Sequence, residues 1–211
     1  MITKILKLYL YVFLLCSVSS TCFSAPPPTI SVLGFVNRVK VTNVNGDLVG
    51  YSSIINDYLV SELIDGGNLD VHEQQSVNDN ETLEKTVNLI EKGKGKDALK
   101  SINTEYVIYG YLTNISIKNS VSEFNSLTGT SFSAKSGTVY VNISAKVVER
   151  KSGRIVFVAA GKGESSGGNN IGGQYDGHIM RVANSDVAQE NINKAIEKAI
   201  FEIGKKINEA V

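Results

Sequence analysis

The first half of the chain places its hydrophobic residues in runs whose spacing changes between that of strands and that of helices. Ile30–Val36 is an almost continuous apolar run, which predicts a buried strand. A helix is predicted from Ser52 or Ser53 to about Asp65, where a Gly-Gly pair ends it. The short run Leu69–Val71 fits a small strand. The predicted helix has one apolar face, made of Tyr51, Ile55, Tyr58, Leu59 and Leu63.

The middle of the chain returns to helical spacing and then to a strand. Asn37–Gly50, before the first helix, is polar and predicted to be a loop. Asn78–Lys92 predicts a second helix that a glycine ends, and Lys96–Ser101 predicts one or two further turns. Glu105–Ile117 is rich in Tyr, Ile and Val, which favours a strand.

The second half begins with the clearest alternation in the sequence. Apolar and polar residues alternate over Val139–Val147, which is typical of a half-buried antiparallel strand. Lys151–Gly153 predicts a hairpin turn, and Arg154–Ala160 predicts the returning strand. Gly161–Gly177 is rich in Gly and Asn and is predicted to be a mobile loop. A long amphipathic helix is predicted from about Ser185 to Glu209.

The order of these elements is β-α-β-α-β-β-β-α. It predicts an α/β fold: one mixed sheet with helices packed on it, an antiparallel hairpin in the second half and a long C-terminal helix. We expect one domain at residues 30–211, preceded by a Pro-rich spacer at 25–29 and a cleaved signal at 1–24.

Met1–Ser24 has the organisation of a secretory signal. Two lysines precede the apolar run Leu8–Val18, which at about 11 residues is too short to span a bilayer as a helix. Cleavage after Ser24 would release a chain that begins at Ala25. Lipidation at Cys22 is the alternative, although Ser19 stands where lipoprotein signals usually carry Leu. We predict an exported protein whose mature form is not lipidated.

Composition excludes some functions of the mature chain. The full chain has 21 basic and 21 acidic residues, and removal of Lys4 and Lys7 leaves 19 against 21, a net charge of −2. This balance gives no electrostatic reason to expect nucleic acid as a partner. Both cysteines, Cys16 and Cys22, lie in the signal, so the mature chain would contain neither a disulfide nor a reactive thiol.

One segment formally matches the motif that presents a nucleophilic serine in α/β-hydrolases. Gly163–Gly167 reads G-x-S-x-G around Ser165, and Asp176 and His178 follow in the required order. The motif needs a strand that turns sharply into a helix, whereas the next six residues, Gly168–Gly173, cannot start a stable helix. We therefore predict no catalysis, and a serine hydrolase remains an alternative for experiment.

Two other patterns have simple structural interpretations. Gly93–Asp97 reads GKGKD but lacks the spacing of a phosphate-binding loop, and is predicted to be a solvated turn between helices. His72 and His178 are the only histidines, and no spacing typical of a zinc site occurs. His72 is predicted to pair at the surface with its neighbour Glu73. No cofactor, metal site or small-molecule substrate is predicted.

Five segments together resemble the CsgG family. Val32–Phe35 resembles the end of its first strand, Ser52–Leu63 its first helix and Leu69–Val71 its following short strand. Thr104–Gly110 (TEYVIYG) is similar to a family strand that ends in glycine. The hairpin Val141–Ile155 (VNISAKVVERKSGRI) is the most specific match, and the resemblance covers most of residues 30–210.

The resemblance implies a non-enzymatic, exported protein of the bacterial outer envelope, located in the periplasm or associated with the outer membrane. The best-known relatives form an oligomeric outer-membrane channel that secretes curli subunits, and the LpoB-type relatives are soluble modules that bind peptidoglycan synthases. The expected partners are therefore proteins, either copies of this chain or envelope proteins. The aromatic constriction loop of the channels has no counterpart here, because Asn37–Gly50 contains no aromatic residue.

Three aromatic residues in the second half are candidates for protein contacts. Phe124, Phe132 and Tyr140 fall in and around the segment Asn114–Val141, which corresponds to an extended hairpin in the channel relatives. Exposed aromatic side chains at such a place would suit contact with another subunit or a partner protein. The alternative is that they cover the domain's own core.

Overall fold

The computed structural model describes residues 25–39, 49–72, 80–125, 131–175, 178–181 and 186–211. The predicted signal, the lipidation candidate Cys22 and most of the predicted loop at 37–50 lie outside these residues. No helix among the described residues is both long and apolar enough to cross a membrane.

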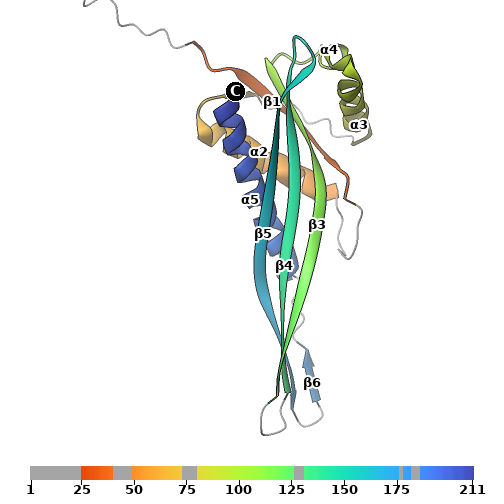
Figure 1. Ribbon diagram of the computed structural model, residues 1–211, viewed down its shortest axis with the longest axis vertical. Coiled ribbons are helices and arrows are strands. Elements are labelled where there is room, and N and C mark those ends of the chain that lie inside the picture. The colour runs from red at the N-terminus through yellow and green to blue at the C-terminus, as the bar shows by residue number, and fades with distance from the viewer. Residues whose placement is uncertain (1–24, 40–48, 73–79, 126–130, 176–177, 182–185) are drawn as a thin grey trace, which may run out of the picture.

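The described strands form one mixed sheet of six, in the order β2-β1-β3-β4-β5-β6 (Figure 1). β1 runs parallel to β2 and β3, and β3 to β6 pair antiparallel in sequence order. The α/β prediction is thus confirmed. The elements are β1 (Thr29–Asn37), α2 (Val49–Gly66), β2 (Asp70–His72), α3 (Asn80–Leu89), the π-helix η1 (Ile90–Lys94), α4 (Gly95–Ala98), β3 (Tyr106–Asn125), β4 (Ser131–Glu149), β5 (Arg154–Tyr175), β6 (His178–Arg181) and α5 (Asp186–Ala210).

The sheet is covered by helices on both faces only near β1. Phe35 of β1 packs with α2 and α5 in the larger core, whereas Leu33 and Val36 pack with α3, η1 and the segment after α4. Both faces of β1 are therefore buried, which explains its uninterrupted apolar run. A bulge between Val32 and Gly34 shifts the alternation by one residue. The larger core includes Ile55, Leu59 and Leu63 of α2 and Ile192, Ile196, Ala199, Ile200, Ile203 and Ile207 of α5.

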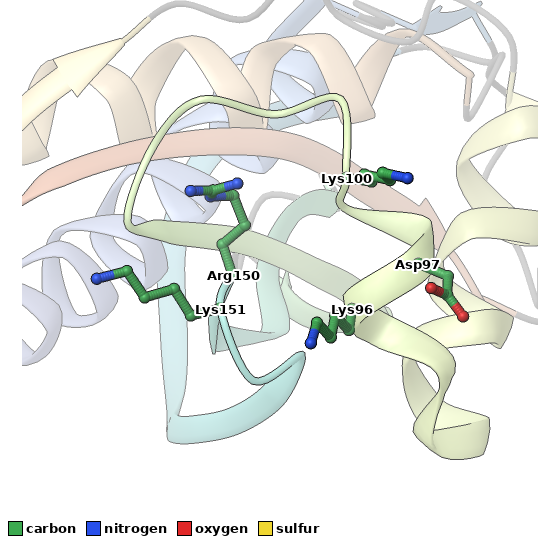
Figure 2. A pocket seen from close by; sticks show the side chains of 5 residues that line it. All are labelled: Lys96, Asp97, Lys100, Arg150 and Lys151. Atoms are coloured by element: carbon green, nitrogen blue, oxygen red, sulfur yellow. The ribbon is translucent and has the colours of Figure 1, made fainter.

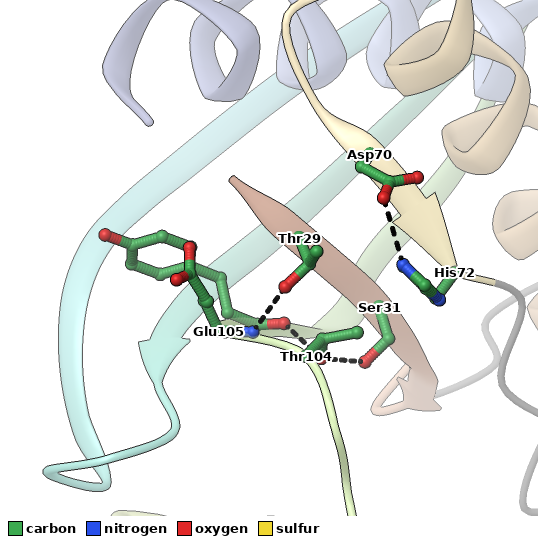
Figure 3. A network of polar contacts seen from close by, with 7 residues as sticks. Thr29, Ser31, Asp70, His72, Thr104 and Glu105 are labelled. Atoms are coloured by element: carbon green, nitrogen blue, oxygen red, sulfur yellow. Dashed lines mark hydrogen bonds and ion pairs between the residues drawn. The ribbon is translucent and has the colours of Figure 1, made fainter. Parts of the chain in front are cut away.

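Polar contacts join the end of the α4–β3 connection to β1 (Figure 3). The buried hydroxyls of Ser31 and Thr104 lie 3.0 Å apart, and Thr104 donates to the carbonyl of Tyr106 at 2.9 Å. The amide of Glu105 donates to the carbonyl and the hydroxyl of Thr29, at 3.1 and 2.9 Å. These bonds place the start of β3 beside β1.

The hairpin turn is confirmed, because Gly153 has a φ of 68° between β4 and β5. The predicted mobile loop at 161–177 is wrong, because residues 161–175 belong to β5 and pair with β4. β3 and β4 also extend beyond their predicted bounds, and α2 begins at Val49, before the predicted cap. Backbone hydrogen bonds between neighbouring strands hold the added lengths of β3, β4 and β5. Such bonds form without an alternation of apolar and polar side chains, so the sequence pattern did not reveal them.

Candidate interaction surface

Three strands of the sheet continue well past the helices as a ribbon (Figure 1). β3 has 20 residues and β5 has 22, and a strand rises about 3.3 Å per residue, so each exceeds about 60 Å. The 25 residues of α5 rise about 1.5 Å each and span only about 37 Å. α5 therefore covers about half of the ribbon.

The far end of this ribbon is the candidate interaction surface. We call residues 119–125, 131–136 and 168–175, together with β6, the distal ribbon. The contact of Asn191 in α5 with Gly167 lies just before it, and no described helix accompanies most of its length (Figure 1). The outer edge of β3 pairs with β1 only up to Leu112, so beyond that residue this edge has no partner strand among the described residues.

The structure separates the three predicted contact residues into two places. The backbones of Phe124 and Phe132 are directly opposite each other near the end of the β3–β4 pair. Tyr140 lies eight residues from Phe132 along β4, about 26 Å away, and pairs with Ser116 and Glu164. The ammonium of Lys118 stands 5.1 Å from the centroid of the Tyr140 ring, within the range of a cation–π interaction.

A row of glycines lets α5 lie directly on β5. A Cβ atom on Gly161 would overlap the backbone carbonyl of Ala199, and one on Gly163 would overlap that of Ala195. A Cβ atom on Gly167 would instead crowd the side-chain amide of Asn191. The glycines that indicated a mobile loop in the sequence thus serve a close approach of helix and strand.

Three side chains of α5 bind the outward-facing backbone groups of β5. Lys206 donates to the carbonyl of Ala160 at 2.8 Å, and Lys198 donates to that of Glu164 at 2.9 Å. Glu202 accepts from the amide of Lys162 at 3.0 Å. The three side chains follow one another every four residues along α5, a rise of about 6.0 Å, and their partners every two residues along β5, a rise of about 6.6 Å. The spacing of the side chains on the helix thus matches the spacing of the backbone groups on the strand. This edge clamp occupies hydrogen-bonding groups that an edge strand otherwise presents to other chains.

A polar and aromatic cluster ties η1 to the face of β3 and β4 that lies opposite α5. Glu91 accepts hydrogen bonds from the Tyr111 hydroxyl at 2.7 Å and the Lys146 ammonium at 2.6 Å. These bonds, Lys146 first, hold the pKa of Glu91 below its usual value. The Arg38 guanidinium stacks 3.8 Å from the centroid of the Tyr111 ring. Burial, followed by the nearby Glu91, raises the pKa of the Tyr111 hydroxyl, which therefore stays a neutral donor.

Ser165 is placed unlike the serine of a hydrolase. It lies inside β5 with 4% of its surface exposed, and its hydroxyl donates to Oδ1 of Asn191 at 3.1 Å. The strand continues to Tyr175 without the sharp turn into a helix that exposes a nucleophile. The described side chains thus give Ser165 a structural role, as the partner of Asn191.

Among the described residues, His72 pairs with Asp70. Its Nε2 lies 3.2 Å from Oδ2 of Asp70, and both side chains are 55% exposed (Figure 3). The predicted partner, Glu73, lies outside the described residues. Within the described ranges, no three His, Cys, Asp or Glu side chains gather closely enough to hold a metal ion.

The comparisons with known proteins identify the family. The model of the family described as "Curli production assembly/transport component CsgG" matches residues 18–211. The chain belongs to the CsgG family. No curated protein matches its sequence.

Among solved structures, the hypothetical protein CT253 from Chlamydia trachomatis shares the fold, with a TM-score of 0.55 and 8% identity over 88% of this chain and 98% of that one. The PelC dodecamer from Paraburkholderia phytofirmans has a TM-score of 0.38 and 11% identity, over 84% of this chain and 89% of that one. The LpoB C-terminal domain from Salmonella enterica has a TM-score of 0.34 and 12% identity, over 66% and 85%. The last two likenesses are too distant to carry an argument about this chain.

Proposed function

We propose that this CsgG-family chain is a non-enzymatic exported protein of the cell envelope, a component of curli-type secretion or assembly at the outer membrane. It would act by self-association and by binding other proteins. Family membership supports the setting, since the family is described as a curli production assembly and transport component. The single observation that carries the mode of action is the distal ribbon, three paired strands that extend past the helices.

The free edges of the ribbon indicate how copies of the chain would associate. β3 has no partner strand on its outer edge after Leu112, and β5 pairs with β6 only at Gly172–Tyr175, among the residues that the structure describes. Unpaired strand edges pair readily with the edges of other chains. Contact between the β3 edge of one subunit and the β5 edge of the next, beyond the edge clamp at residues 160–164, is heterologous and closes into a ring when the rotation between subunits divides a full turn.

Phe124, Phe132 and Tyr140 are the residues that we propose at these contacts. The opposed pair in the distal ribbon would reach a neighbouring subunit or a cargo protein. Tyr140 would add a contact nearer the domain, beside Lys118. Aromatic residues are enriched at the buried centres of protein interfaces, which favours this assignment.

The mature protein would begin at Ala25 and act in the periplasm or peripherally at the outer membrane. The three prolines Pro26–Pro28 would then form a stiff spacer before β1. Mass spectrometry of the protein purified from an exporting bacterium tests this start. A mass that begins at Ala25 is expected, and a diacylated Cys22 would instead anchor the domain in a membrane.

Light scattering after size exclusion tests the proposed association. The chain 25–211 is expected to elute as a ring of many subunits in buffer, in detergent, or in both. Phe124→Ser with Phe132→Ser should shift it toward the monomer. Phe201→Ser is the matched control, because Phe201 is 57% exposed on α5 and far from the distal ribbon. A monomer or dimer indifferent to detergent would refute the channel-type role and leave a soluble module that binds a cell-wall enzyme.

A further inference from the structure

A basic pocket (Figure 2) lies between α4 and the β4–β5 turn, at the opposite end of the sheet from the distal ribbon (Figure 1). It has a volume of about 510 Å³ and is lined by Lys96, Asp97, Lys100, Arg150 and Lys151. Three of these come from α4 and the turn after it, and two, Arg150 and Lys151, come from the β4–β5 turn. Residues fifty or more positions apart in sequence thus supply one cluster.

Two glycines hold the two walls of the pocket together. A Cβ atom on Gly95 would overlap the carbonyl of Gly153, and one on Gly153 would overlap the amide of Lys96. Gly93, with a φ of 77°, kinks the chain inside η1, between α3 and α4. The GKGKD segment was predicted to be a solvated turn between helices; only the kink at Gly93 fits this, because Gly95–Asp97 already belong to α4 and Gly95 is buried. The glycines also bring Lys96 against the β4–β5 turn, which the sequence does not reveal.

The positive charge of the pocket is not neutralised by neighbouring side chains. The lining has four cations and one carboxylate, although the mature chain as a whole carries a small negative charge. None of the five side chains forms an ion pair or a side-chain hydrogen bond within the part of the chain that the structure describes. Nε of Arg150 is buried and has no hydrogen-bond partner there. A buried donor without a partner costs free energy, and an acceptor toward which the Arg150 side chain turned would recover it.

We propose that this pocket binds a phosphate ester, with the phosphate held by Arg150, Lys96 and Lys151, whereas Lys100 points away from Arg150 (Figure 2). Guanidinium and ammonium groups form short, charge-assisted hydrogen bonds to phosphate oxygens, and several cations favour a dianion over a single carboxylate. The volume exceeds that of a bare phosphate ion and falls within the usual range for small organic ligands. The organic part would be about the size of a sugar.

A free sugar phosphate and the headgroup of a phosphorylated lipid share this chemistry, and titrations of the chain 25–211 distinguish them. Calorimetry with glucose 1-phosphate in 50 mM NaCl is expected to give a Kd below about 1 mM, and glucose should not bind. Phosphatidylcholine vesicles that contain phosphatidic acid form the second arm. Binding only to these vesicles would assign the pocket to a lipid headgroup. Failure in both arms would overturn the proposal.

Charge-changing variants test whether the ligand lies in this pocket. Lys96→Gln and Arg150→Gln should each weaken binding about tenfold, because each removes one charged hydrogen bond. Asp97→Asn should tighten binding two- to threefold, which loss of structure would not do. Lys205→Gln, an exposed lysine on α5, should leave the Kd unchanged. Equal affinities for all four variants would place binding elsewhere and refute the pocket.

Discussion

Addition of one methyl group at Gly163 tests whether α5 rests directly on the backbone of β5. Gly163 does not have a positive φ, so alanine can adopt its backbone conformation. At such a position Gly→Ala ordinarily stabilises a protein by about 0.4–1 kcal/mol, because it reduces the entropy of the unfolded chain. Here the new Cβ would overlap the carbonyl oxygen of Ala195. The packing thus predicts the opposite sign.

The size of the loss follows from the atoms that collide. Overpacking a tight core costs about 1–3 kcal/mol and occasionally more. Both sides of this contact are main chain or bonded directly to it, so no change of rotamer relieves the overlap and α5 must move. We expect Gly163→Ala to lower the free energy of unfolding by about 3 kcal/mol. For a chain of this length, that corresponds to a fall in Tm of about 6–12 °C.

Urea denaturation of the chain 25–211, followed by far-ultraviolet circular dichroism, measures this loss, and thermal melting checks it. Ala160→Val is the matched control, because it enlarges an exposed side chain three residues away on the same strand. Its effect should stay within about 0.5 kcal/mol. A Gly163→Ala protein as stable as the wild type, or more stable, would show that α5 does not contact this strand as described.

Three further predictions concern side chains. The hydrogen bond from Lys206, followed by that from the amide of Lys162, lowers the pKa of Glu202 below its ordinary value of 4.5. The ionised Glu202 therefore stabilises the fold fully at a pH above 4.5, and this stabilisation is lost as the pH falls through the pKa of the folded state. Denaturation curves between pH 3 and 6 should therefore show a smaller acid loss in Glu202→Gln than in the wild type, and equal losses would contradict this. Tyr111→Phe should cost about 1–2 kcal/mol in urea denaturation, because it removes the hydrogen bond to Glu91, and no loss would argue against the cluster. Ser165→Ala should leave the hydrolysis of an activated ester at the wild-type background, whereas loss of a measurable activity would revive the hydrolase alternative.

The fold was predictable where buried residues recur at a regular spacing along the chain. The alternation over Val139–Val147 found the part of β4 that packs on α5, and the apolar stripe of the last helix placed α5 to within a residue at each end. Prediction stopped where the strands leave the helices. Apart from Phe132, Ser131–Gly137 consists of small or polar residues, and its strand conformation comes from pairing with β3 and β5. Such pairing leaves no periodic mark in the sequence.

The candidate surfaces were harder to predict for the same reason. The aromatic residues were found from their composition and their place in the hairpin, but the distance between Phe132 and Tyr140 depends on one unbroken strand. The edge clamp joins residues about forty positions apart, and the basic pocket joins α4 to the β4–β5 turn. A lysine in a sequence shows its charge but not which backbone carbonyl or which other cation it approaches.

The sequence by itself determined the class of the fold, the hairpin turn at Gly153 and the amphipathic last helix. These follow from local spacing, because residues two or about four positions apart share a face whatever surrounds them. Tertiary structure alone decided what Gly161, Gly163 and Gly167 do. Glycine is equally suited to a mobile loop and to a strand on which a helix rests, and only the position of α5 distinguishes the two. Because the glycine-rich segment is a strand, β5 continues into the distal ribbon on which the proposed function depends.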